Sequence, residues 1–334
     1  MQCVNKPMPL LCRMWIPAAG ACCAYAGAGM VVTAAEYPER PIRLIVASAP
    51  GGQPDINSRM FAQELSKQFK QQVIVDNRAG ATGLIGYEML AKASPDGHTM
   101  SYVAFSLATN PTLIPKLQYD VARDMQLIIL THISPNILGV APSLPVKSVT
   151  ELISYAKQNP GKLMFGSGGT GASSHIGMEL FMQMTGAPLV HIPYKGVQQA
   201  ITEMIGGRLH LLSDNASPMM PHITSGRLRG LGTTGTRRVP IAPDLPTIAE
   251  AGVPGYEITP WGGYAVPAGT PKSIVMRLNA ELNKIVAMPY VRERWIAVGI
   301  EPIGGTPEHF TAHVKKETAK WSEVIKRMQA KPAD

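Results

Sequence analysis

The stretch PIRLIVASAPGGQPD, residues 41–55, joins an apolar run to the start of a helical pattern. The β-branched residues of its first half predict a buried strand. Beyond it, apolar residues recur at helical spacing, at Ile56, Met60, Phe61, Leu65 and Phe69. Residues 49–55 separate the two elements, and in their middle Pro50, Gly51 and Gly52 leave the backbone before the helix uncovered by side chains. Because a helix start carries free N–H groups and a partial positive charge, the stretch predicts a bound anion.

The same alternation continues along the chain. Strand patterns occur in PIRLIVAS, QQVIVDN, HTMSYVAF, NILGVAPS, GKLMFGS, PLVHIPY, LHLLSDN and LRGLGTT. Helical patterns lie between them and again in the C-terminal part. This order predicts an α/β fold with a mostly parallel sheet. The alternation of strands and helices begins afresh at NILGVAPS, and in a chain of 334 residues this predicts two lobes. In such sheets ligands bind at the carboxyl ends of the strands, here in the cleft between the lobes.

Three loops share the form of strand, glycine-rich turn and helix start. They are residues 49–55, 77–83 and 166–174. Glycines let a ligand oxygen approach the backbone closely, so such a loop can hold a carboxylate or phosphate without a charged side chain. One loop of this kind would be interpreted as a plain tight turn. Three of them, all at predicted strand ends, favour binding.

Several kinds of site are excluded. Residues 166–171 match G-x-G-x-x-G, but a dinucleotide site needs an acid about 20 residues on, and the next strand, PLVHIPY, has none. There is no G-x-S-x-G motif, and the histidines lack metal-binding spacing, so no catalytic set, metal or cofactor is predicted. Asp55 could act as an acid or base, but it is expected to cap its own helix. His175 could be a base, although a plain polar histidine is favoured.

The first 35 residues differ from the rest of the chain. They hold Lys6 and Arg13, no acid, an apolar middle, and small residues at Thr33 and Ala35. This pattern predicts a secretory signal peptide, residues 1–35, cut after Ala35. A disordered tail and a lipoprotein cut before Cys22 are the alternatives. All four cysteines lie in this segment, so the mature chain has no disulfide and no thiolate site, which suits a bacterial periplasm.

The net charge of the mature chain limits the classes of molecule that it could bind. Without the two bases of the signal peptide, the chain keeps 29 basic and 23 acidic residues, a formal charge of +6. The basic residues are dispersed, and aromatic residues make up only 6% of the chain. This pattern excludes a nucleic-acid groove and favours small anionic molecules.

Longer stretches carry a family resemblance. The segment from Tyr37 to Met100, together with GSGGTGASSHI, HIPYKGVQQAITEMIGG and WGGYAVPAGTPKSIVMRLN, resembles the Bug family, the substrate-binding proteins of tripartite tricarboxylate transporters. The resemblance implies a periplasmic, two-lobed binding protein of the type II, Venus-flytrap class. It also implies a monomer that is not an enzyme, that holds a small organic mono- or dicarboxylate between its lobes, and that delivers it to a membrane permease.

The same resemblance assigns ligand contacts to the three loops and to positions beyond them. Lys195 of YKG and the pair Asp214-Asn215 of LLSDN match further cleft positions. Trp261 either stacks on the ligand or anchors the crossing between lobes. The full set expected to bind ligand is Ser48, Gly51, Gly52, Gln53, Asp55, Ala81, Thr82, Gly83, Ser167, Gly168, Gly169, Thr170, Ser173, Ser174, His175, Lys195, Asp214, Asn215 and Trp261.

One departure from the family concerns ligand size. The family commonly has Pro-Phe-Pro where this chain has Ala47-Ser48-Ala49. In the family the aromatic ring packs on the ligand, so its absence leaves room. Either the ligand is larger, with an aromatic carboxylate as one option, or another side chain such as Trp261 fills the gap.

The sequence therefore predicts a periplasmic receptor for an organic carboxylate. One lobe is expected at residues 36–139 plus 262–334 and the other at residues 140–261. Two other functions stay open. One is a secreted hydrolase that uses Asp55 and His175 across the cleft. The other is a receptor that reports its ligand to a sensor kinase.

Overall fold

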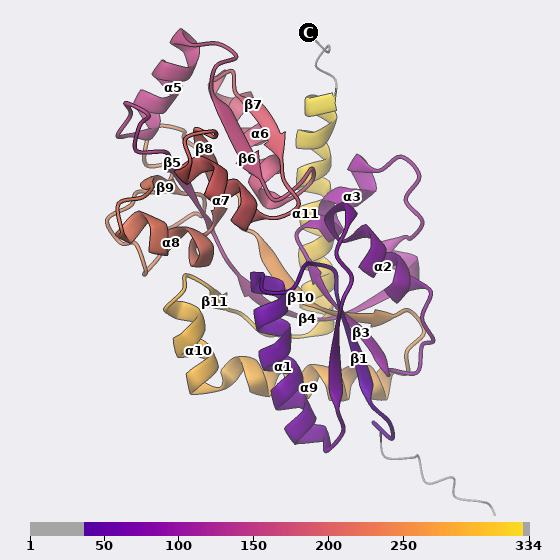
Figure 1. Ribbon diagram of the computed structural model, residues 1–334. Coiled ribbons are helices and arrows are strands. Elements are labelled where there is room, and N and C mark those ends of the chain that lie inside the picture. Colours follow the sequence, from indigo (N-terminus) through magenta and orange to yellow (C-terminus); the bar gives the residue numbers. More distant parts are fainter. Residues whose placement is uncertain (1–36, 330–334) are drawn as a thin grey trace, which may run out of the picture. The chain divides into compact units, whose positions relative to one another are not determined.

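The computed structural model describes residues 37–329, which form two β-sheets with helices packed on them (Figure 1). The predicted signal peptide, residues 1–35, lies outside the described residues. The strands are β1 (Ile42–Val46), β2 (Val73–Asn77), β3 (Thr99–Ala104), β4 (Met125–Ile133), β5 (Asn136–Val140), β6 (Met164–Ser167), β7 (Val190–Pro193), β8 (Leu211–Asn215), β9 (Arg229–Thr233), β10 (Trp261–Pro267) and β11 (Glu301–Pro302). The helices are α1 (Gln53–Phe69), η1 (Ala81–Gly83), α2 (Leu84–Ala91), α3 (Ser106–Leu113), α4 (Val121–Asp124), α5 (Val149–Gln158), α6 (Ser173–Thr185), α7 (Val197–Ile205), α8 (Ala216–Thr224), α9 (Lys272–Ala287), α10 (Pro289–Ile296) and α11 (Pro307–Gln329).

Both sheets are mixed. The first has the order β11-β4-β10-β3-β1-β2, and the second has the order β7-β6-β8-β5-β9. The pairs β1–β2, β1–β3, β6–β7 and β6–β8 are parallel, as the sequence predicts for strands that lead into glycine loops. The pairs made by β4, β5 and β10 are antiparallel, so parallel pairing is confined to the part of each sheet that bears the loops. The α/β class with two sheets is confirmed, but the expectation of mostly parallel sheets is wrong, because β4, β5 and β10 add antiparallel pairs to each sheet.

The chain passes twice between the sheets. It leaves β4 at Ile133 and enters β5 at Asn136, slightly before the lobe boundary expected at residue 139. It returns after β9, and β10 begins at Trp261, beside the second expected boundary. The two crossings lie side by side, because the Ser134 backbone N–H donates to the Pro260 carbonyl at 2.8 Å.

The eight strand patterns expected from the sequence all appear, whereas β4, β10 and the two-residue β11 were not expected. β10 contains Gly262 and Gly263, which weaken any strand pattern. Here the missing side chains are required by packing. A Cβ on Gly263 would lie 2.2 Å from the Ile129 carbonyl oxygen, and one on Gly262 would lie 2.0 Å from the Tyr102 hydroxyl.

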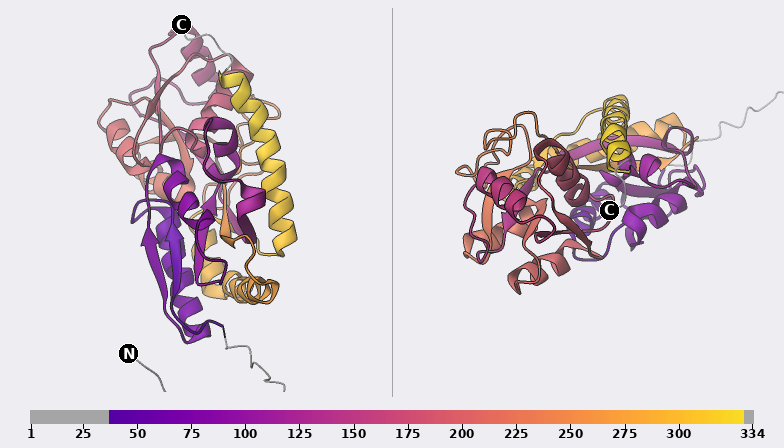
Figure 2. Two further views of the ribbon diagram at one scale, coloured as in Figure 1. Left: turned by 90° about the vertical axis from the view of Figure 1, so that its right-hand side faces the viewer. Right: turned by 90° about the horizontal axis from the view of Figure 1, so that it is seen from above.

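The helix α11 connects the two sheets on their outer side. It packs against β4 and α3 of the first sheet and against α6 of the second (Figure 2). The Gln183 side-chain amide of α6 donates to the Val324 carbonyl of α11 at 3.0 Å. Trp321 of α11 is fully buried and packs edge-on against Phe105. Because α6 carries the third glycine loop, α11 helps to fix that loop relative to the first sheet.

Candidate functional site

The first loop leads from β1 into α1, and Asp55 holds it in place. Gly52 is the N-cap residue of α1, and the Asp55 carboxylate, in the first turn, accepts from the Gly51 backbone N–H at 2.9 Å. It also accepts from the Asn77 amide at 2.9 Å and from the Arg59 guanidinium. Burial acts to raise the pKa of Asp55, but the hydrogen bonds from Arg59, Gly51 and Asn77 outweigh it and hold that pKa below its usual value. Asp55 therefore does not cap α1 as the sequence predicts, because Gly52 is the N-cap residue, and Asp55 instead holds the preceding loop through the Gly51 N–H.

Asn77, at the end of β2, joins the first loop to the second. Its amide donates to the Ser48 carbonyl at 3.2 Å as well as to Asp55. The second loop then turns through η1 into α2. Thr82 lies in the left-handed region at φ 53°, which is uncommon for a residue with a β-branched side chain. Gly83 follows at φ 88°, and a Cβ there would lie 2.9 Å from the Tyr87 ring, so this position requires glycine.

The third loop leads from β6 into α6, and its backbone is bonded to its own side chains. The Gly168 N–H donates to the Ser174 hydroxyl at 3.0 Å, and the Gly169 N–H donates to the Ser167 hydroxyl at 3.2 Å. The Gly171 N–H donates to Nδ1 of His175 at 3.2 Å. Since the loop's serine and histidine side chains satisfy these donors, the glycine turn is held in one conformation before any ligand arrives.

Two stacked imidazoles support the third loop. The ring of His175 lies 4.0 Å from that of His191, centroid to centroid, and His191 stacks in turn on Phe165. Nε2 of His191 lies 2.6 Å from the Ser167 hydroxyl. Burial lowers the pKa of His175 to about 3, helped by His191, and lowers that of His191 to about 4. Both rings are therefore neutral near pH 7.

The end of β8 lies beside the start of α6. The Asp214 carboxylate accepts from the Asn215 backbone N–H at 2.8 Å and from the Ser174 hydroxyl. The Asn215 amide donates to the Asn136 side chain and to the Ser134 carbonyl, both at 3.0 Å. The Ser173 hydroxyl lies 3.5 Å from the Asn136 amide. Asp214, Asn215, Ser173 and Ser174 thus belong to one buried polar network under the third loop.

The second and third loops meet although they belong to different sheets. The Thr82 hydroxyl donates to the Thr170 carbonyl at 2.6 Å. Beside it, the Thr109 hydroxyl of α3 donates to the Gly171 carbonyl at 3.1 Å. The first bond brings the start of α2 close to the third loop, and the second brings α3 to it, while Asn77 ties the first loop to the second. All three predicted loops are therefore connected.

Only part of the expected backbone remains available to receive an anion. Gly51, Gly168 and Gly169 already donate to Asp55, Ser174 and Ser167. In the described part of the chain, hydrogen bonds are lacking at the first-turn N–H groups of Gly52, Gln53 and Asp55 on α1, and of Ser173 and Ser174 on α6. These are the donors that a helix start leaves free.

The remaining expected residues lie in different settings. The hydroxyl of Ser48 and the amide oxygen of Gln53 are buried and lack a partner among residues 37–329. Lys195 is exposed ahead of α7. Trp261 is 2% exposed and packs edge-on against Phe310 and His313 of α11, at the crossing into β10. This packing is the anchoring role that the sequence left open, and contact of Trp261 with ligand stays a prediction.

Sequence reasoning missed three side chains that organise the loops: His191, Asn136 and Thr109. His191 stands in the strand PLVHIPY, where a histidine among apolar residues could have indicated a buried partner. Asn136 and Thr109 carried no local signal, because their partners lie far away in the sequence.

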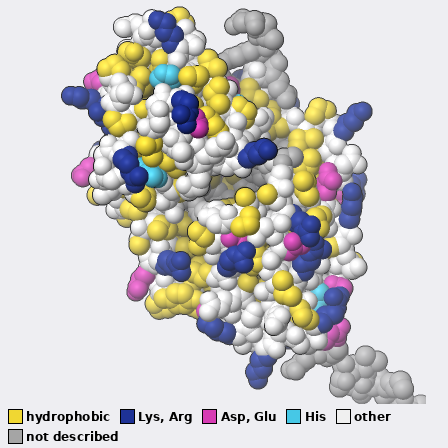
Figure 3. All heavy atoms as spheres, in the orientation of Figure 1, with side chains coloured by type: hydrophobic (Ala, Val, Ile, Leu, Met, Phe, Trp, Pro, Cys, Tyr) yellow, Lys and Arg dark blue, Asp and Glu magenta, His cyan; other side chains and the backbone are white. Residues whose placement is uncertain are grey.

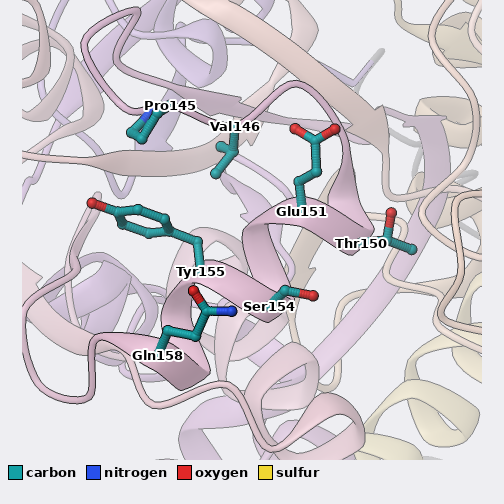
Figure 4. Close-up of a pocket in the computed structure, with 7 residues that line it drawn as sticks. All are labelled: Pro145, Val146, Thr150, Glu151, Ser154, Tyr155 and Gln158. Atoms are coloured by element: carbon teal, nitrogen blue, oxygen red, sulfur yellow. The ribbon is translucent and has the colours of Figure 1, made fainter.

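Two surface hollows lie away from the loops. One, beside α5, has a volume of about 310 Å³ and is lined by Pro145, Val146, Thr150, Glu151, Ser154, Tyr155 and Gln158 (Figure 4). The Glu151 carboxylate in it caps α5 by accepting from the Lys147 N–H. The other, about 480 Å³, lies between α8 and the end of α10. Neither is lined by a residue expected to bind ligand.

On the face drawn in Figure 3, Lys and Arg side chains are scattered among Asp and Glu rather than gathered in one patch. Among residues 37–329, no group of three or more His, Cys, Asp or Glu side chains could hold a metal ion. In the same part of the chain, each helix is too short or too polar to cross a membrane.

Comparison with known proteins identifies the family. A family model described as the tripartite tricarboxylate transporter family receptor matches residues 57–330. A solved R. palustris protein with adipate is 37% identical, with a TM-score of 0.83 over 87% of this chain and 97% of that one. The periplasmic binding protein BugD is 33% identical, with a TM-score of 0.81 over 87% and 98% of the two chains. MatC from Rhodopseudomonas palustris, with bound malate, is 27% identical, with a TM-score of 0.81 over 86% and 100%. The chain belongs to the tripartite tricarboxylate transporter receptor family, the periplasmic solute-binding proteins that include BugD.

Proposed function

We propose that this receptor binds a small dicarboxylate between its two sheets, with one carboxylate at the first and second loops and the other at the third. The observation that carries the proposal is the 2.6 Å hydrogen bond from the Thr82 hydroxyl to the Thr170 carbonyl. It joins the second loop to the third loop, which leads into α6, while Asn77 ties the second loop to the start of α1. The free N–H groups lie at the starts of α1 and α6.

Electrostatics favours a ligand with a negative charge at each end. Helix starts carry a partial positive charge, and in this proposal the starts of α1 and α6 would each meet one carboxylate, without needing a cation beside it. Two relatives of known structure hold dicarboxylates, adipate in one and malate in the other. A monocarboxylate, whether aliphatic or aromatic, would use the same donors at one end of the site only.

A receptor is favoured over a hydrolase by the state of the two candidate catalytic groups. Asp55 is 3% exposed, and its carboxylate already accepts from Gly51, Asn77 and Arg59. Nδ1 of His175 accepts from the Gly171 N–H, and the pKa of His175 is lowered to about 3. A group with so low a pKa is a weak base at neutral pH.

Calorimetry with a panel of carboxylates tests the proposal. Adipate, malate, citrate and terephthalate would each be titrated into the purified protein, and the solution would afterwards be checked for chemical change. We expect a dicarboxylate to bind at one site per chain and to be recovered intact. Turnover of ester or amide derivatives of these acids would instead establish the hydrolase.

Export and delivery complete the proposal. We propose that the signal peptide is removed, that the monomer acts in the periplasm, and that it passes its ligand to a tripartite permease. Two lobes, residues 36–139 plus 262–334 and residues 140–261, would close about the two crossings on binding. Protein released from the periplasm should begin at Glu36 or Ala35, and an intact Met1 there would contradict export. Uptake that is unchanged after the chain is deleted would favour the sensor-kinase alternative.

A further inference from the structure

We propose that the Asp214 carboxyl group is protonated in the bound state and donates a hydrogen bond to a ligand carboxylate, so that binding takes up one proton near neutral pH. The inference rests on the proposed function, and it makes Asp214 a specificity-determining residue.

The geometry places this acid directly under the third loop. Asp214 ends β8, is 9% exposed, and accepts from the Asn215 N–H and the Ser174 hydroxyl. The same Ser174 hydroxyl accepts from the Gly168 N–H at 3.0 Å. One hydroxyl therefore separates the Asp214 carboxyl from the glycine turn, and the free N–H groups of Ser173 and Ser174 lie on the same helix start.

The surroundings of Asp214 offer little to offset a negative charge. Burial raises its pKa to about 6, against the smaller opposing effect of the bonds from Asn215 and Ser174. The elements packed on β8 are β5, β6, α6, α7 and α8. Their titratable groups are His175 and Glu179 on α6, Glu203 on α7 and His222 on α8. His175 is neutral near pH 7 because burial and His191 lower its pKa to about 3, and Lys195, ahead of α7, is exposed.

A bound dianion makes the ionised form of Asp214 still less favourable. A second carboxylate close to a buried one raises its affinity for a proton, and the proton is then shared as an O–H donor toward the ligand. A ligand that carried an ammonium group would have the opposite effect, because it would pair with the ionised acid. The sign of the pH dependence therefore distinguishes a dicarboxylate from an amino acid.

The test is calorimetry of adipate binding from pH 5 to pH 8, in buffers that differ in ionisation enthalpy. Above pH 6 the free protein must take up a proton to bind, so the affinity of the parent protein should fall about tenfold per pH unit. Proton uptake should approach one per site at pH 8. The variant Asp214→Asn, which mimics the protonated acid, should bind without proton uptake, and at pH 7 it should bind about tenfold more tightly than the parent.

The matched control is Asp244→Asn, at an exposed acid outside the loops. It should retain the pH profile of the parent protein. Adipate binding with no proton uptake, or with affinity that rises with pH, overturns the inference and leaves the proposed function intact. If no carboxylate of the panel binds at any pH, both fail.

A second measurement needs no ligand. The folded pKa of Asp214 lies above its unfolded value of 3.8, so between about pH 4 and pH 6 the folded chain keeps a proton that the unfolded chain releases. The free energy of unfolding of the parent protein should therefore fall relative to Asp214→Asn as pH rises through this window. Parallel stability curves for the two proteins would contradict a protonated Asp214.

Discussion

A single carbon added at Gly52 or Gly168 should weaken dicarboxylate binding by about 1–3 kcal/mol, roughly 5- to 150-fold, while the protein stays folded. A Cβ on Gly52 would come no closer than 3.6 Å to its neighbours, and one on Gly168 no closer than 3.8 Å. The protein itself therefore accommodates alanine at both positions. Only a ligand that lies against the backbone would meet the added carbon. Calorimetry of Gly52→Ala and Gly168→Ala with adipate measures the effect.

The matched control is Gly206→Ala. Gly206 is exposed at the end of α7 with φ −74°, a conformation that alanine adopts without strain, and a Cβ there would come no closer than 3.4 Å to its neighbours. All three variants should unfold at temperatures close to that of the parent protein, and Gly206→Ala should keep full affinity. Full affinity in both Gly52→Ala and Gly168→Ala would refute the placement of the site at these loops.

Replacement of Ser48 by phenylalanine should change which ligands fit. Ser48 follows β1, and its hydroxyl is buried without a partner among the described residues. A phenylalanine ring adds about 150–250 Å² of surface to be buried, most of it where the body of a long ligand would lie. Ser48→Phe should weaken adipate binding at least about tenfold and leave malate, which is shorter, bound as well as before or better.

Ser48→Ala separates size from polarity in the same experiment. It removes the hydroxyl without adding volume, so both dicarboxylates should bind with little change. If Ser48→Phe leaves adipate affinity unchanged or improves it, the expectation of a larger ligand is wrong. In that case another side chain fills the space that the family's aromatic ring takes.

The parts of the fold that depend on local pattern could be predicted from the sequence. The strands before the first two glycine loops are short β-branched runs, and the apolar face expected for α1 is buried. Asp55 was expected to cap α1, but it lies in the first turn behind the N-cap Gly52 and accepts from the Gly51 N–H ahead of the helix. A local role for Asp55 could be predicted because its partner lies within a few residues, but the donor it meets could not.

The parts that depend on distant pairing could not be predicted in this way. The β10 strand is defined by its neighbours β3 and β4, because Gly262 and Gly263 allow close approach of Tyr102 and the Ile129 carbonyl. The bond from Thr82 to Thr170 joins residues 88 positions apart. The sequence also suggested bare backbone throughout the glycine turns, whereas Ser167, Ser174 and His175 satisfy much of it. Each of these contacts needs the tertiary arrangement.

The placement of the ligand can be tested by a crystal structure of the protein with adipate. We expect one adipate between the two sheets. One carboxylate should lie against the first-turn N–H groups of α1 and the second loop, and the other against Ser173 and Ser174 at the start of α6, within reach of Asp214. Adipate in the hollow beside α5 or in that between α8 and α10, with the three loops unoccupied, would contradict the account.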